Sequence, residues 1–172
     1  MDLRFTTPSL RRLDLAGTEV LVATLAEDER PPHGVAGLVD FRLAGRISRL
    51  LRRGFATGKL GEVVLVAGKP KLPFDKVLLF GVGPKASFGE AVFGEVVEKI
   101  LTTLENLRAR AAVVELPGRP WDGVPPERAA DLLLERAGNR REHDVWTLVD
   151  TSDAQRLITQ HMVQERRRIR DE

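Results

Sequence analysis

The chain has 172 residues, which is enough for one domain with a substantial core. It contains no cysteine, and this excludes disulfides, thiolate metal sites and a cysteine nucleophile. The net charge of +2 does not by itself indicate a nucleic-acid-binding protein. The first residues show no apolar signal segment, and no apolar run approaches the roughly 18 residues of a membrane span, so we expect a cytoplasmic protein.

The first half of the chain alternates apolar runs with one helical pattern. Residues 19–25 (EVLVATL) predict a strand, which a polar segment and a Pro-Pro pair end. Residues 43–53 (LAGRISRLLRR) carry apolar side chains at helical spacing and predict a helix that stops at Gly54. Residues 62–67 (EVVLVA) and 76–82 (KVLLFGV) predict two further buried strands.

The second half continues the alternation. Ser87 and Glu90 stand at the spacing of a capping box, which predicts that a helix begins there and runs to about Arg108. The remaining expected elements are a strand over residues 111–116, a helix over residues 126–138 and a strand over residues 145–149. Strands that alternate with helices in this way indicate an α/β fold, with a mostly parallel sheet flanked by helices.

The last segment predicts a long helix with a basic end. Thr151 and the two residues after it form the expected N-terminal cap. Apolar side chains follow along one side of the helix, at Leu157, Ile158, Met162 and Ile169. We expect the first two turns to pack on the body, and the rest to lie in solvent or against another chain. The chain is therefore divided into a domain over residues 1–150 and a C-terminal helix over residues 151–172.

One glycine-rich loop has the outline of a phosphate-binding loop. It follows the apolar run at residues 76–82 and precedes a helix, where free amides can bind an anion. The residues that would bind such a ligand are Gly81, Gly83, Lys85 and Ser87. However, Ala86 stands where a dinucleotide fingerprint needs glycine, and Pro84 removes one amide. A tight structural turn is the favoured interpretation, with ligand binding as the alternative.

No catalytic constellation is visible in the sequence. The three histidines lie far apart and have no metal-ligand spacing, and no serine lies in a nucleophile elbow. The carboxylates occur singly in helices and turns. We therefore expect no catalytic residue, no metal site and no cofactor.

Arginines recur on the expected helix over residues 43–53 and again at the C-terminus. Their spacing places several on one helix face, and together the two clusters could contact phosphates. The residues concerned are Arg46, Arg49, Arg53, Arg166 and Arg167. A solvated basic face is the favoured interpretation, and nucleic-acid binding is the alternative.

Three short motifs in order resemble the N-terminal domain of leucyl (cytosol) aminopeptidases. They are GRISRLL at residues 45–51, FATGKLGE at residues 55–62 and VLLFGVGPK at residues 77–85. The second motif has one extra residue before Gly58, and the third has Pro84 inserted before its lysine. The resemblance covers roughly residues 15–118.

This resemblance implies a three-layer, macro-domain-like fold that performs no chemistry. In the family, a separate C-terminal domain binds two metal ions and cleaves peptides, and the signatures of that domain do not occur in this sequence. The implied role is a non-catalytic accessory domain that forms homo-oligomers or binds a protein partner, such as a full-length aminopeptidase, away from membranes. Two alternatives stay open: a nucleotide or ADP-ribose-type ligand at the glycine loop, and DNA binding, which some bacterial members show.

Overall fold

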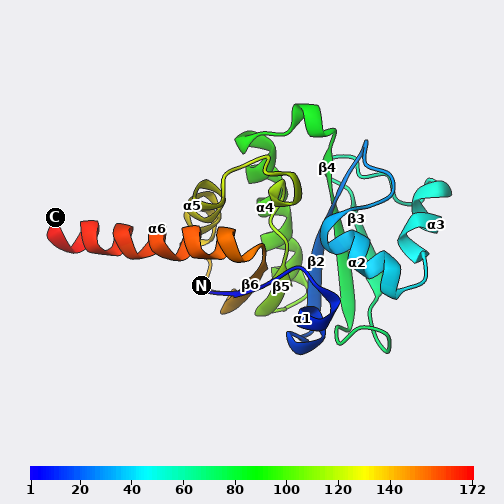
Figure 1. Cartoon of the computed structure of the whole chain (residues 1–172), viewed down its shortest axis with the longest axis horizontal. Coiled ribbons are helices and arrows are strands. Elements are labelled where there is room, and N and C mark those ends of the chain that lie inside the picture. Colours follow the sequence, from blue (N-terminus) through cyan, green and yellow to red (C-terminus); the bar gives the residue numbers. More distant parts are fainter.

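Six strands form one sheet in the order β1-β6-β5-β2-β4-β3 (Figure 1). A computed structural model describes all 172 residues. All neighbouring strands are parallel except β3, which runs antiparallel to β4 at one edge. The strands are β1 (Asp2–Thr6), β2 (Val20–Ala26), β3 (Val63–Ala67), β4 (Lys76–Gly83), β5 (Ala111–Val114) and β6 (Val145–Val149). The predicted α/β class and mostly parallel sheet are confirmed.

Helices cover both faces of the sheet. On one face lie α4 (Glu90–Asn106) and α5 (Pro126–Ala137), and on the other lie α1 (Leu10–Leu15), α2 (Gly34–Arg42) and α3 (Arg46–Arg52). Alternate side chains of β2 point to opposite faces of the sheet. Val20 and Val22 pack with α4 and α5, whereas Leu21 and Ala23 pack with α1 to α3. This two-sided burial explains the continuous apolar runs of the central strands.

The last helix, α6 (Ser152–Asp171), leaves the body (Figure 1). Thr151 caps it by accepting a hydrogen bond from the Ala154 amide, as predicted. Only Ala154 and Ile158 of this helix are buried. Its later turns extend past α5 into solvent. No helix of the protein combines the length and the apolar character that a membrane span requires.

Two predictions about the helices are wrong. The capping box at Ser87 does not form, because Ser87 lies in a short 3-10 turn and α4 begins at Glu90 after Gly89. The helix predicted over residues 43–53 begins three residues later, because Ala44 and Gly45 have positive φ angles of 54° and 82° and separate α3 from α2.

Candidate functional site

The carboxyl ends of β2, β5 and β6 lie along one edge of the sheet, where ligands bind in many α/β folds. A cavity of about 240 Å³ opens at this edge. Four charged side chains border it: Glu115, which follows β5, Asp150, which follows β6, and Arg119 and Asp122 from the loop after β5. The N-terminus of α2 contributes Gly34. This cavity is the candidate site.

Glu115 joins three elements at the edge of the sheet. Its carboxylate accepts hydrogen bonds from the Val35 amide at 2.7 Å, the Thr24 hydroxyl at 3.0 Å and the Thr24 amide at 3.4 Å. Val35 belongs to the first turn of α2, so the carboxylate occupies the place at this helix N-terminus where an external anion would bind. The α2 terminus is therefore satisfied from within the protein.

Burial changes the acidity of Glu115. The side chain is only 3% exposed, and its removal from water raises the pKa to about 7, although the donors from Val35 and Thr24 favour the charged form. The neighbouring carboxylate of Asp150 makes a smaller contribution to the same rise in the pKa. Glu115 is thus a carboxyl group that exchanges its proton near neutral pH.

Arg119 and Asp150 form a buried ion pair beside Glu115. The Arg119 Nε donates to Asp150 Oδ2 at 2.7 Å, and its Nη1 donates to the Val124 carbonyl at 2.7 Å and to Asp122 Oδ1 at 2.9 Å. Both Arg119 and Asp150 are buried. The pair fixes the loop after β5 to the end of β6 and to the start of α6.

The chemical capacity of this arrangement is limited. Glu115 has the pKa of a general acid or base, but its oxygens are occupied by donors of the fold itself. The side chains of Arg119 and Asp150 are engaged with each other. No group of three or more metal-ligating side chains is assembled anywhere in the protein. The cavity therefore has the character of a polar, internally satisfied cleft.

The predicted ligand loop lies at the end of β4, and the amides of its four candidate residues have acceptors. Gly81 donates to the Glu62 carbonyl, Gly83 to the Gly58 carbonyl, Lys85 to Asp28 Oδ1 and Ser87 to the Pro84 carbonyl. A Cβ on Gly81 would collide with the backbone carbonyl of Lys59, so this glycine permits close packing of two loops. Phosphate binding by this loop stays a prediction, and a ligand would have to compete with these bonds.

The charge of Lys85 is likewise engaged. Its ammonium group forms an ion pair with Glu29 and lies 5.2 Å from the centre of the Trp121 ring. Trp121 in turn meets Phe88 edge-on, with ring centres 5.3 Å apart. Lys85 thus connects the loops that follow β2, β4 and β5.

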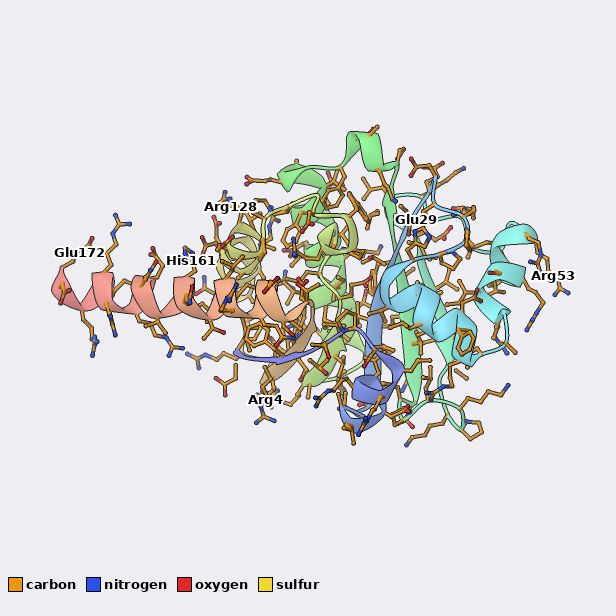
Figure 2. The ribbon with its side chains drawn as sticks, in the orientation of Figure 1. Arg4, Glu29, Arg53, Arg128, His161 and Glu172 are labelled. Atoms are coloured by element: carbon orange, nitrogen blue, oxygen red, sulfur yellow. The ribbon has the colours of Figure 1, made fainter.

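The two predicted arginine clusters do not form one surface. Arg46, Arg49 and Arg53 lie on and just after α3, whereas Arg166 and Arg167 lie on the projecting part of α6. Figure 2 shows Arg53 and the C-terminal Glu172 at opposite ends of the molecule. The expectation of a combined phosphate-contacting surface is therefore wrong in its geometry, and nucleic-acid binding by either cluster stays a prediction.

Glu115, Arg119 and Asp150 were not predicted as functional residues from the sequence. One signal was available for Glu115, because a glutamate directly follows the apolar run AAVV and precedes Leu116. No comparable signal marks Arg119 or Asp150, since their pairing depends on how the loop after β5 folds back over the sheet.

Most of the chain matches one known protein family. Residues 20–139 match the family model described as "Cytosol aminopeptidase family, N-terminal domain". The chain belongs to the cytosol aminopeptidase family. A probable cytosol aminopeptidase of Pseudomonas fluorescens is 37% identical over 100 residues, which cover 58% of this chain and 20% of that protein. The cytosol aminopeptidase of Pseudomonas aeruginosa PAO1 is 31% identical over 118 residues, which cover 69% of this chain and 24% of that protein.

The chain thus matches about a fifth to a quarter of the length of these relatives. The resemblance to the N-terminal domain of the family is confirmed.

Solved structures with the same fold include macrodomains. One Oceanobacillus iheyensis macrodomain structure, of a mutant, aligns with a TM-score of 0.69 at 14% identity, over 96% of this chain and 92% of that one. The macrodomain of Thermus aquaticus DarG aligns with a TM-score of 0.63 at 17% identity, over 85% of this chain and 97% of that one. A tomato leucine aminopeptidase mutant aligns with a TM-score of 0.60 at 14% identity, over 94% of this chain and 35% of that one. The predicted macro-domain-like fold is confirmed.

Proposed function

We propose that this domain is a non-catalytic accessory module that binds a protein partner. The projecting part of α6 forms the binding surface. In the simplest case, the partner is a second copy of the chain. The single observation that carries the proposal is the continuation of the apolar side of α6 beyond the body. Ile158, Met162 and Ile169 follow one another at spacings of four and seven residues, which places them on one helix face.

The exposure of this face changes along the helix. Ile158 is buried near α5, Met162 is half-buried, and Ile169 is 69% exposed. His161 adds a polar contact between the two helices, with its Nε2 2.9 Å from Asp131 Oδ1 of α5. The apolar face that holds α6 on α5 therefore continues to a part of the helix that nothing in the chain covers.

The proposed role does not include peptide hydrolysis. We propose that the protein acts in the cytoplasm. The buried polar groups at the sheet edge are engaged with each other, and the resemblance of the chain is to the N-terminal domain alone. The ligand-binding alternative has less support, because the amides of the glycine loop already have acceptors. One Oceanobacillus iheyensis macrodomain of the same fold was solved with ADP, but at 16% identity this likeness concerns the fold.

The test is the mass in solution, measured by light scattering after size exclusion. We expect an oligomer for the natural sequence and a monomer for Ile169→Glu, because a carboxylate in an apolar contact cannot be desolvated without a partner. Gln164→Glu is the matched control, since it adds the same charge on another face of the same helix. A natural chain that stays monomeric at high concentration, or an Ile169→Glu variant that associates as well as the control, would contradict self-association.

A further inference from the structure

The surface around α3 carries arginines without carboxylate partners. Elsewhere the arginines commonly pair, as in Arg42 with Asp14, Arg110 with Asp144 and Arg128 with Glu90. By contrast, no carboxylate lies within ion-pair distance of the arginines of this corner, which are Arg30, Arg46, Arg49, Arg52 and Arg53, and all of them are exposed. This corner is the end of the molecule opposite α6 (Figure 2).

A groove of about 510 Å³ crosses this surface. Arg30 and Arg52 border it, and its apolar lining comes from Pro31, Pro32 and Leu51. Ser48 completes the lining, but its hydroxyl donates to Asp40 Oδ2 at 2.5 Å. The groove therefore combines two positive charges with an apolar floor.

The two guanidinium groups differ in how they are held. Arg30 is fixed by hydrogen bonds to three backbone carbonyls, those of Ala26 at 3.2 Å, Glu29 at 2.7 Å and Thr57 at 2.9 Å. The Arg52 guanidinium makes no bond within the protein, so all of its donors are available to a ligand. One border of the groove is thus a fixed positive charge, and the other can form a bidentate bond with a carboxylate.

The nearby acidic groups make no direct bond to the two arginines that border this groove. The Asp40 carboxylate accepts hydrogen bonds from the Ser48 amide at 2.9 Å and from the Ser48 hydroxyl. It therefore binds the first turn of α3. Glu29 pairs with Lys85 and accepts from the His33 amide. Glu62 accepts from Thr57 and Gly58. An acidic ligand would therefore supply carboxylates that bond these two arginines directly.

We propose that the groove between Arg30 and Arg52 binds an acidic segment of a partner protein that presents an apolar side chain between its carboxylates. The carboxylates meet the two arginines, and the apolar side chain covers the two prolines and Leu51. The phosphodiester backbone of a nucleic acid has no group that covers this floor, which is why a peptide fits better. This surface is separate from α6 and does not depend on self-association.

The experiment measures binding of a fluorescent peptide of glutamates around a central leucine, by anisotropy. We expect saturable binding that weakens as salt is raised, and at least about a tenfold loss of affinity in Arg52→Glu and in the double variant Arg30→Gln/Arg52→Gln. Arg52→Glu is informative even if the double variant unfolds, because the Arg52 guanidinium has no internal bond to lose. The matched control is Arg108→Gln/Arg141→Gln, which removes two exposed, unpaired arginines elsewhere.

Two further probes decide the class of ligand. The same peptide with serine in place of leucine should bind several-fold more weakly if the apolar floor is used. Duplex DNA should bind no better to the natural chain than to Arg52→Glu. Three results would overturn the proposal. The leucine and serine peptides could bind with equal affinity, or the control variant could lose as much peptide affinity as the groove variants. The third result is that the Arg52 substitution weakens DNA binding but not peptide binding. The mass in solution should be unchanged by the α3 variants, so failure here is distinguishable from failure of the α6 proposal.

Discussion

Glu115 shows how a single residue can link the stability of the fold to pH. Its carboxyl replaces an external cap at the start of α2 while standing in the interior of the protein. Because burial raises the pKa above that of an unfolded glutamate, the folded state binds the proton more tightly than the unfolded state does. The stabilisation from this proton is complete below about pH 4.5 and is lost as the pH rises through about 7.

The variant Glu115→Gln isolates this contribution. Its amide can keep a hydrogen bond from Val35 and donate to the Thr24 hydroxyl, and it does not titrate. The quantity to compare is the free energy of unfolding of the natural chain minus that of the variant. We expect this difference to fall by about 3 kcal/mol from acidic to mildly alkaline pH. Urea denaturation across that range is the measurement. A difference between the two proteins that is constant with pH would show that Glu115 titrates normally.

The buried ion pair of Arg119 and Asp150 affects the stability of the fold in a different way. Removing one partner of a buried ion pair leaves an uncompensated charge, so Arg119→Ala should lower the free energy of unfolding by about 3–5 kcal/mol. Arg110→Ala is the matched control, because the Arg110–Asp144 pair is about half exposed and worth at most about 1 kcal/mol. Urea denaturation at neutral pH compares the two. Equal losses would mean that the loop after β5 does not rely on the buried pair.

At the scale of elements, α6 is exceptional because half of it lacks tertiary support. A short helical segment without packing is only marginally stable in water. Its own side chains contribute little, since the Arg168–Glu172 pair is exposed on both sides. A partner that covers Ile169 would therefore order the end of the helix as well as bind it.

Hydrogen exchange of the α6 amides tests this coupling. We expect amides of residues 164–171 to exchange rapidly in the monomeric Ile169→Glu variant and to become protected when the natural chain associates. The amides of α4, which is buried along one side, should be protected equally in both proteins. Strong protection of residues 164–171 in the monomer would instead show that this part of α6 is stable alone.

The elements that were predicted from the sequence are those whose own residues specify them. The central strands β2 and β4 are buried on both faces and read as continuous apolar runs. By contrast, β1 is a half-exposed edge strand that includes Asp2 and Arg4, and its local signal is weak. The helix α2 contains two glycines and two valines, which have poor helix propensity, and it forms because Val35, Ala36 and Val39 are buried against the sheet.

The candidate site was less predictable because it is assembled by long-range contacts. Glu115 meets Val35 across 80 positions of sequence, and Arg119 meets Asp150 across 31. The glycine loop had a local pattern, but the pattern could not reveal that its amides have acceptors in neighbouring loops. The spacing of the arginines predicted that several of them share one helix face. It could not show that the turn at Ala44 and Gly45 places Arg42 on α2, where it pairs with Asp14.

At the scale of the whole molecule, the charge is distributed unevenly along the long axis. Unpaired arginines gather in the α3 corner at one end and on the outer turns of α6 at the other, whereas the body between them carries most of the ion pairs and a few scattered unpaired arginines such as Arg108 and Arg141. A small net charge of +2 therefore conceals two basic ends. Separate partners can be bound at the two ends, because the surfaces do not overlap.

The projecting helix also changes how the protein moves through solution. Nine residues follow Met162, the last half-buried apolar residue of α6, up to Asp171, so the helix extends the body by about 14 Å. A compact body with such a rod has a larger hydrodynamic radius than a sphere of 19.1 kDa. A single protomer therefore diffuses as if it were heavier, and its elution volume on a calibrated column overstates its mass.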